Sequence, residues 1–262
     1  MVIETATVRA NDRLARGIYK LELEAPAIAA AVRPGQFVEV LIDESPVPLL
    51  RRPMSVASRQ GDHIALIYKI FGVGTKTMAA WEPDVAVNLL GPLGNGWQLA
   101  DGSYPILAGG GVGIAPISFL HDELLEQGIE HQLIMGARAR AEHYLSHAPE
   151  NAITLATDDG SLGIKGTVLD GIAGVRERLG SDRITIYGCG PTPMLAALQA
   201  FVRDHNLACQ LSMETIMGCG FGICQGCTVE LTRPPDPPPH SYREHYQLAC
   251  LDGPVFWARD LA

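Results

Sequence analysis

Four cysteines near the C-terminus constrain this chain more than any other feature of its sequence. Cys219, Cys224 and Cys227 are separated by four and two residues, and Cys250 follows after 22 more. This is the plant-type spacing of the ligands of a 2Fe-2S cluster. Glycines between the cysteines tolerate positive φ and leave space for backbone N–H groups to approach the sulfurs. We therefore predict a 2Fe-2S cluster held by these four thiolates.

Other interpretations of the cysteines remain open at this point. A structural zinc site would favour two C-x2-C pairs, and unliganded thiols can simply be buried. The sequence has no secretory signal, so its cysteines are expected in a reducing compartment, where ligand or redox use is commoner than structural bridging. Cys209, in an apolar context, is expected to pack in the core.

The bulk properties of the chain narrow its function class. With 262 residues, 47% of them hydrophobic, it can bury substantial cores. Its formal net charge of −9 would repel a phosphate backbone, so nucleic acid is not an expected partner. No stretch reaches membrane-spanning length. We expect a soluble cytoplasmic protein.

The first part of the chain has the pattern of β-strands. Hydrophobic residues tend to alternate there, as in Tyr19–Leu23, Phe37–Val40 and Ile64–Tyr68. A period of two with short turns favours an antiparallel barrel or sandwich. The glycine-rich stretch Gly91–Gly96 interrupts the pattern, so we predict a first domain over residues 1–100.

Beyond residue 100, apolar strand candidates alternate with helical stretches. The strand candidates are Tyr104–Ala108, Gln132–Met135, Ile153–Ala156 and Ile184–Tyr187, and the helical stretches include Ala115–Glu126 and Pro193–Arg203. This order predicts a parallel sheet covered by helices over residues 101–209. The last segment, 210–262, is too short and too rich in Gly, Cys and Pro for a sizeable core, and therefore needs a cofactor or a neighbour.

Three further motifs suggest anion binding, and each also has an ordinary structural explanation. The strand candidate before Gly109–Gly113 leads through that turn into a helix, whose free N–H groups and positive dipole end favour phosphate. A tight turn without a ligand is the alternative. Arg51 and Arg52 could clamp a diphosphate, or form a solvated strand edge. Gly72–Thr75, before a short helical stretch, is either a second anion site or an ordinary turn.

Taken in order, these features resemble the ferredoxin-NADP reductase superfamily, and most closely the electron-transfer subunits of class B dihydroorotate dehydrogenase. The resemblance covers essentially the whole chain. It implies that FAD is bound by Arg52, Pro53, Met54, Ser55, Ile67, Tyr68, Lys69, Gly74 and Thr75. It implies that NAD is bound by Gly109, Gly110, Gly111, Gly113, Asp158, Cys189, Gly190 and Pro191.

The resemblance also supports the cluster and implies a mechanism. It assigns the cluster ligands to Cys219, Cys224, Cys227 and Cys250, and makes Cys189 a candidate catalytic thiol near the nicotinamide and the flavin. Flavin links hydride chemistry to one-electron chemistry. The chain would pass electrons between NAD and a partner subunit that holds FMN and oxidises dihydroorotate to orotate in pyrimidine biosynthesis. A heterotetramer with two copies of each subunit is implied.

The sequence departs from the family pattern in two places. The 22 residues between Cys227 and Cys250 exceed the usual spacing and include a proline-rich run, Arg233–Pro239, which is expected to be a loop. Met54 stands where the broader superfamily places an aromatic ring against the flavin. Reductase subunits of a hydrogenase, a sulfite reductase or an NADH-ferredoxin transhydrogenase remain alternatives. A non-enzymatic zinc-binding interaction module is an alternative of another class.

Overall fold

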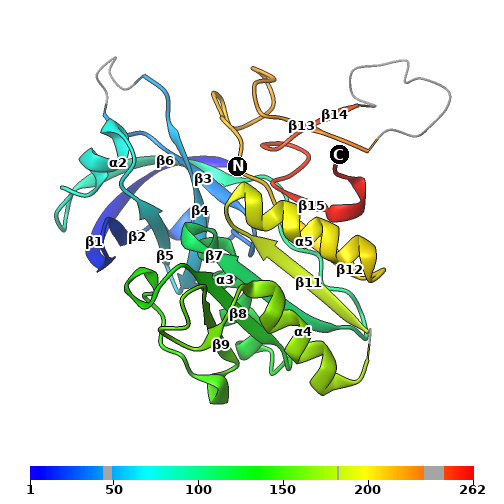
Figure 1. The fold of residues 1–262 in the computed structure, drawn as a ribbon. Coiled ribbons are helices and arrows are strands. Elements are labelled where there is room, and N and C mark those ends of the chain that lie inside the picture. The colour runs from blue at the N-terminus through cyan, green and yellow to red at the C-terminus, as the bar shows by residue number, and fades with distance from the viewer. Residues whose placement is uncertain (44–48, 182, 233–244) are drawn as a thin grey trace.

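The first part of the chain is a closed antiparallel barrel in the computed structural model, which describes residues 1–43, 49–181, 183–232 and 245–262 (Figure 1). Its strands are β1 (Val2–Ala15), β2 (Ile18–Glu24), β3 (Phe37–Val40), β4 (Arg52–Gln60), β5 (His63–Lys69) and β6 (Ala86–Leu93). They pair in the order β1-β2-β5-β4-β3-β6. Two short helices, α1 (Pro26–Ala29) and α2 (Val73–Met78), lie between strands. The predicted antiparallel barrel is confirmed.

Strand β3 departs from the simple alternation of a barrel strand. Val38 and Val40 point into the barrel core, as the period-two pattern requires. Phe37 and Glu39 lie on the opposite face, yet both are buried, and Glu39 is only 1% exposed. An antiparallel sheet usually leaves its polar face to water. The outer face of β3 is therefore covered by another part of the protein.

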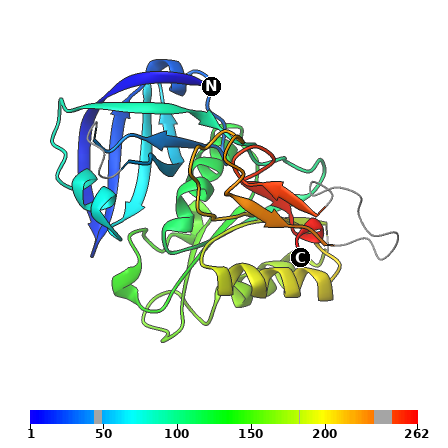
Figure 2. The same ribbon diagram turned by 90° about the horizontal axis from the view of Figure 1, so that it is seen from above.

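The second part is a mostly parallel sheet beside the barrel (Figure 2). Its order is β10-β9-β8-β7-β11-β12-β15. The strands are β7 (Tyr104–Gly110), β8 (Gln132–Ala137), β9 (Ile153–Thr157), β10 (Ile164–Lys165), β11 (Ile184–Cys189), β12 (Ala208–Ser212) and β15 (Val255–Trp257). Only β15 runs antiparallel to its neighbour. The predicted helix-covered parallel sheet is confirmed.

Helices cover both faces of this sheet. Because neighbouring strand residues point to opposite faces, each face presents its own set of apolar side chains to the helices that cover it. α3 (Ile114–Glu126) packs on the face that carries Leu107, whereas α4 (Val168–Leu179) and α5 (Thr192–Asp204) pack on the face that carries Ile106. α3 also contacts the barrel, because its Phe119 belongs to the barrel core. Short 3-10 helices occupy Gly111–Gly113, Arg140–Glu142, Pro149–Asn151 and Ala258–Asp260. α3 thus joins the barrel to the sheet.

The cysteine-rich segment lies against the other two parts and shares a strand with one of them. β13 (Thr228–Glu230) and β14 (Tyr246–Leu248) form a small hairpin-like sheet. β15 then pairs with β12, with Phe256 opposite Leu211. The backbone N–H of Asn95, between barrel and sheet, donates to the Gly253 carbonyl. The segment obtains from its neighbours the core that it cannot build by itself.

Two expectations from the sequence have no structural outcome here. The proline-rich run Arg233–Pro239 lies outside the described residues. The domain boundaries after residues 100 and 209 stay predictions. Within the described part of the chain, no helix combines the length and the hydrophobicity needed to cross a membrane.

Candidate functional site

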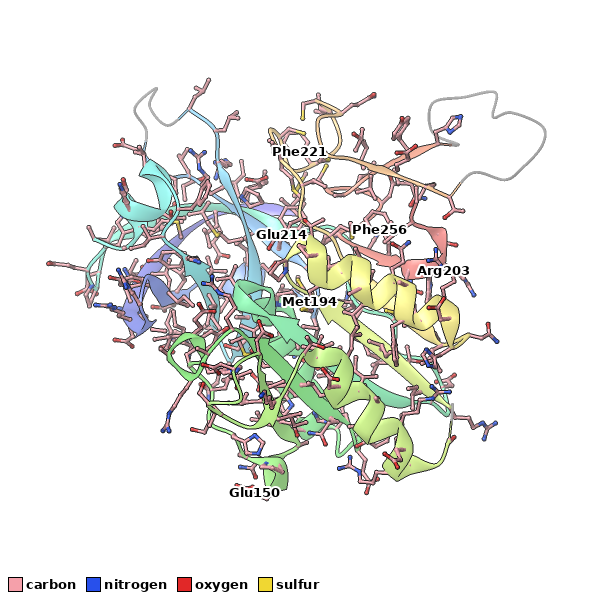
Figure 3. The ribbon with its side chains drawn as sticks, viewed as in Figure 1. Glu150, Met194, Arg203, Glu214, Phe221 and Phe256 are labelled. Carbon is pink, nitrogen blue, oxygen red and sulfur yellow. The ribbon has the colours of Figure 1, made fainter. Side chains whose placement is uncertain are left out.

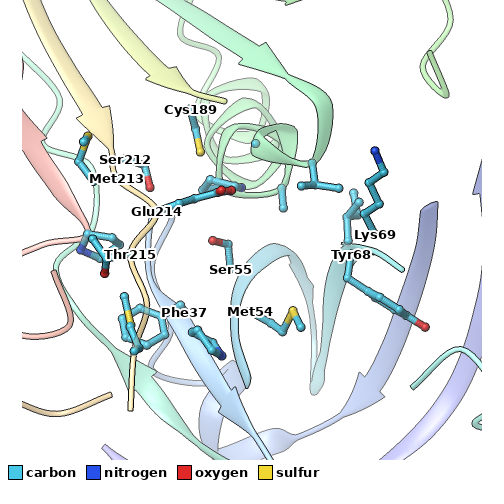
Figure 4. Close-up of a pocket in the computed structure, with 18 of the residues that line it drawn as sticks. Phe37, Met54, Ser55, Tyr68, Lys69, Cys189, Ser212, Met213, Glu214 and Thr215 are labelled. Atoms are coloured by element: carbon cyan, nitrogen blue, oxygen red, sulfur yellow. The ribbon is translucent and has the colours of Figure 1, made fainter. Parts of the chain in front are cut away.

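One pocket of about 410 Å³ lies where the three parts of the chain meet (Figure 4). Its barrel side is formed by Phe37, Pro53, Met54, Ser55, Ile67, Tyr68, Lys69, Phe71 and Thr75. Its other side is formed by Val112, Gly113, Ala115, Pro116, Cys189, Ser212, Met213, Glu214, Thr215, Met217 and Pro254. This volume is in the range of cofactor and ligand sites. Seven of the nine predicted FAD residues thus share one cavity with two of the predicted NAD residues.

Tyr68 lines this pocket, and its side chain also packs in the core of the barrel. Its hydroxyl group hydrogen-bonds the Asn11 side-chain oxygen at 3.0 Å, and its ring stacks on Tyr19 with centroids 5.8 Å apart. Burial raises the pKa of Tyr68 to about 12, so the hydroxyl group stays protonated at neutral pH. Ser55 and Met54, by contrast, point into the cavity (Figure 4).

The two predicted FAD residues outside the pocket lining, Arg52 and Gly74, lie beside each other. A Cβ added at Gly74 would lie 3.0 Å from Arg52 Nε, so glycine leaves space for the guanidinium at the start of α2. Thr75 Oγ1 accepts hydrogen bonds from the backbone N–H groups of Phe71 and Gly72, at 2.8 and 3.2 Å. A guanidinium next to a helix N-terminus suits a diphosphate.

Arg51, the other member of the arginine pair, has a structural role. Its guanidinium donates to Asn88 Oδ1 at 2.6 Å and to the carbonyl groups of Asn88 and Glu39. These contacts tie the chain before β4 to β6 and β3. The two arginines, which the sequence could not tell apart, therefore have different surroundings: Arg51 is held by β3 and β6, and Arg52 lies beside Gly74.

The predicted NAD residues gather at the carboxyl ends of the parallel strands. Cys189 is in register with Gly109, and a Cβ added at Gly113 would lie 2.5 Å from the Cys189 carbonyl oxygen. A Cβ at Gly110 would lie 3.2 Å from Pro191 Cδ, and Gly111 has a φ of +57°. A side chain at Gly110 or Gly113 would clash with its neighbours, and the positive φ of Gly111 favours glycine. These two constraints explain why glycines form the turn. Ligands of open α/β sheets bind at this edge.

Asp158 and Cys189 occupy different places at this edge. Asp158 follows β9, and its backbone N–H donates to the Ala137 carbonyl at 3.2 Å, outside the pocket lining. Cys189 is buried and lines the pocket. Burial and the nearby Glu214 carboxylate raise the pKa of the Cys189 thiol to about 12. The raised pKa keeps the thiol protonated at neutral pH, so that it can donate a weak hydrogen bond.

Sequence reasoning missed the residues that follow β12. Glu214 extends between the barrel and the end of the sheet (Figure 3), beside Cys189 and Ser55 (Figure 4). Burial raises the pKa of its carboxyl group. Met217, only two residues before Cys219, lines the same pocket, as does Pro254. The signal that could have indicated this role for Glu214 and Met217 was their position directly before the cysteine motif.

The four cysteines of the motif lie in two neighbouring pairs. The sulfurs of Cys227 and Cys250 are 3.1 Å apart, and the backbone N–H of Cys224 points to Cys219 Sγ at 3.4 Å. The Gly222 N–H donates to Cys250 Sγ at 3.1 Å. Although burial opposes it, hydrogen bonds from the N–H groups of residues 224, 221 and 223 lower the pKa of Cys219 to about 7.

This arrangement fits an iron-sulfur cluster by the chemistry of its donors. A 2Fe-2S cluster takes two thiolates on each iron and is stabilised by hydrogen bonds to its sulfurs. Gly220 and Gly222 have φ values of +80° and +86°, which turn the loop so that its N–H groups face the sulfurs. The pairs of thiols and the inward N–H groups match both requirements.

Comparisons with known proteins agree with this geometry. Residues 214–262 match a family model described as the iron-sulfur cluster binding domain of dihydroorotate dehydrogenase B. The chain is 36% identical over 257 residues to the dihydroorotate dehydrogenase B (NAD(+)) electron transfer subunit of Shouchella clausii, covering 95% of this chain and 94% of the relative. It is 34% identical to the corresponding subunit of Caldanaerobacter subterraneus, covering 98% and 97%.

Solved structures show the same fold. An NADH-dependent reduced ferredoxin-NADP oxidoreductase structure superposes with a TM-score of 0.82 at 24% identity, covering 98% of this chain and 89% of that one. A ferredoxin NADP+ reductase from Neisseria gonorrhoeae superposes with a TM-score of 0.63 at 15% identity, covering 77% and 91%. At these identities the likeness concerns fold alone. On its sequence identity over nearly its full length, this chain belongs to the family of dihydroorotate dehydrogenase B electron transfer subunits.

Proposed function

We propose that this chain carries FAD and a 2Fe-2S cluster and transfers electrons between NAD and a partner subunit. The observation that carries this proposal is the composition of the pocket. Ser55 from the barrel, Cys189 from the sheet and Met217 from the approach to the first cysteine line one cavity. A cofactor in that cavity would contact the predicted NAD residues on one side and the segment that leads to the cluster ligands on the other. Family membership supports the same activity.

The residues of the barrel hold FAD in this proposal. Arg52 and the N-terminal N–H groups of α2 bind its diphosphate, and Ser55 and Lys69 face its ring system. When bound, FAD supplies the exchange between a two-electron hydride and single electrons. Met54 and Phe37 exclude water from the barrel side of the cavity.

The residues of the sheet hold NAD. The Gly109–Gly113 turn and the start of α3 offer N–H groups and a positive dipole end to its diphosphate. Cys189, Gly190 and Pro191 place the nicotinamide at the edge of the cavity, beside Gly113. Asp158 lies at the same sheet edge, directly after β9, and its carboxylate accepts hydrogen bonds from the ribose hydroxyl groups.

An exposed apolar patch surrounds the cysteine loop and is the proposed docking surface of the partner. We call it the loop patch; it consists of Ile216, Phe221, Ile223 and Leu251. Ile216 is 89% exposed and Ile223 is 74% exposed, and Phe221 lies on the cysteine loop (Figure 3). Exposed apolar residues grouped at one site mark interaction surfaces. The partner is an FMN-containing subunit that oxidises dihydroorotate to orotate, in a heterotetramer with two copies of each.

Ile223→Asp is expected to weaken this assembly. A carboxylate buried without a counter-charge at the centre of an interface costs about 2 kcal/mol or more, which is roughly a thirtyfold rise in Kd. The measurement is the Kd of the purified subunits by calorimetry. Leu125→Asp is the matched control, because Leu125 is also exposed, at 51%, but lies on α3. Equal Kd values for Ile223→Asp and the parent would place the partner elsewhere.

A cofactor count tests the proposal as a whole. Anaerobically purified protein is expected to contain one FAD and two irons per chain, with the visible spectrum of a flavin and an iron-sulfur cluster superposed. Zinc in place of iron, and a colourless protein, would instead support an interaction module. Co-purification with an FMN subunit that oxidises dihydroorotate separates this function from that of a hydrogenase or sulfite reductase subunit.

A further inference from the structure

A buried carboxyl group lies between the barrel and the cysteine loop. Glu39 is on the outer face of β3, two residues from Phe37, which lines the pocket. It is 1% exposed, and neither of its carboxyl oxygens has a hydrogen-bond partner among the described residues. Burying a carboxyl group without partners is costly. Such a group calls for an explanation beyond packing.

Gly220, the neighbour of the first cysteine of the motif, touches this carboxyl group. A Cβ added at Gly220 would lie 2.5 Å from Glu39 Cγ and 2.7 Å from Glu39 Oε1. The residue that turns the cysteine loop therefore rests on the side chain of Glu39. Since Phe37 on the same strand face borders the pocket, Glu39 lies on the side of the barrel that joins the pocket to the loop.

Neighbouring groups of both charge signs act on the carboxyl group of Glu39. Burial raises the pKa of Glu39 to about 7, whereas the charges of Arg51 and Arg52 oppose this rise, and Cys219 adds to it. Arg51 donates its hydrogen bonds to the backbone of Glu39 and to Asn88, not to the carboxyl group. The carboxyl group thus interacts with the loop through a medium of low dielectric, where charges act strongly on each other.

We propose that Glu39 sets the reduction potential of the iron-sulfur cluster. This inference rests on the proposed function, because it requires the cluster at the four cysteines. Reduction of the cluster adds one electron, and a carboxylate behind the loop disfavours that added negative charge. Glu39 is a positioning residue in this role: it acts on the cluster through charge, across Gly220, and binds neither iron nor flavin.

The test is the midpoint potential of the cluster in the whole protein, measured at pH 8.5 by anaerobic titration followed by electron paramagnetic resonance. Glu39→Gln keeps the shape of the side chain and removes its charge, so the midpoint is expected to rise above that of the parent. Glu39→Asp keeps the charge but withdraws it by one methylene group, and a smaller rise is expected. Glu82→Gln, which removes an exposed carboxylate from the barrel, is expected to leave the midpoint unchanged.

Each outcome of this test decides the question. A Glu39→Gln protein with full iron content and the parent's midpoint overturns the inference, as does an equal shift in Glu82→Gln. A Glu39→Gln protein that binds FAD but no cluster shows a role in loop structure and also overturns it. Should that variant fail to fold, an unmoved midpoint in Glu39→Asp overturns it. Absence of iron from the parent would instead defeat the proposed function.

Discussion

Cys227→Ser is expected to abolish electron transfer to and from the partner subunit while sparing the chemistry of the flavin. Cys227 is buried with its sulfur 3.1 Å from that of Cys250, so a hydroxyl group there breaks one of the two ligand pairs. The FAD residues belong to the barrel and keep their places. The measurement is NADH oxidation with an artificial acceptor, expected near the parent rate, beside partner-linked turnover, expected at background.

Cys209→Ser is the matched control for this prediction. Cys209 is also a buried cysteine, but it lies on β12 in the core of the sheet and outside the ligand motif. Its replacement is expected to leave the iron content and both activities near those of the parent. Unchanged partner-linked turnover in Cys227→Ser would contradict the ligand assignment, and so would an equal loss in Cys209→Ser.

Arg52→Ala is expected to produce the largest loss of FAD affinity. A bidentate guanidinium on a diphosphate makes charge-assisted hydrogen bonds, and their loss costs about 3 kcal/mol, or roughly 150-fold in Kd. Because the cluster ligands lie in another part of the chain, the iron content should remain that of the parent. The measurement is FAD binding to the flavin-depleted protein by fluorescence quenching.

Two further variants sharpen the assignment of Arg52. Arg52→Lys keeps the charge but lacks the planar fork, so its affinity for FAD is expected to lie between those of the parent and the alanine variant. Arg13→Ala removes an exposed arginine of β1 whose side chain donates to the nearby Ala15 carbonyl, and should leave the affinity for FAD unchanged. A parent-like Kd in Arg52→Ala would remove this residue from the FAD site.

Local periodicity was enough to predict most of the fold. The alternation in β2 and β5 indicates a barrel, and apolar runs followed by helical stretches indicate the parallel sheet that contains β7 and β11. Helix α4 was not among the helical stretches named from the sequence, and it contains Gly171 and Gly174, which lower helix propensity. A Cβ at Gly171 would lie 2.8 Å from Ile134, so close packing on the sheet requires glycine there.

The site was harder to predict, because its residues come from distant segments. Glycine turns and the cysteine motif have local signatures, and these residues were named in advance. Glu214 and Glu39 have none: a single glutamate in an alternating or loop segment reads as solvated surface. Glu39 is buried on the outer face of β3, where the cysteine loop docks against its side chain. When burial depends on contact with a distant segment, the adjacent residues in the sequence do not predict it.

The pairing of β15 with β12 limits how this protein can be divided. An independent ferredoxin-like module could be exchanged between proteins as a cassette, but here the last strand closes the border of the nucleotide-binding sheet. A chain cut after Ser212 would leave β12 with unpaired backbone groups, an open template for self-association. The cysteine-rich segment is thus also a guard against aggregation, and engineers who wish to replace it must keep Val255–Trp257.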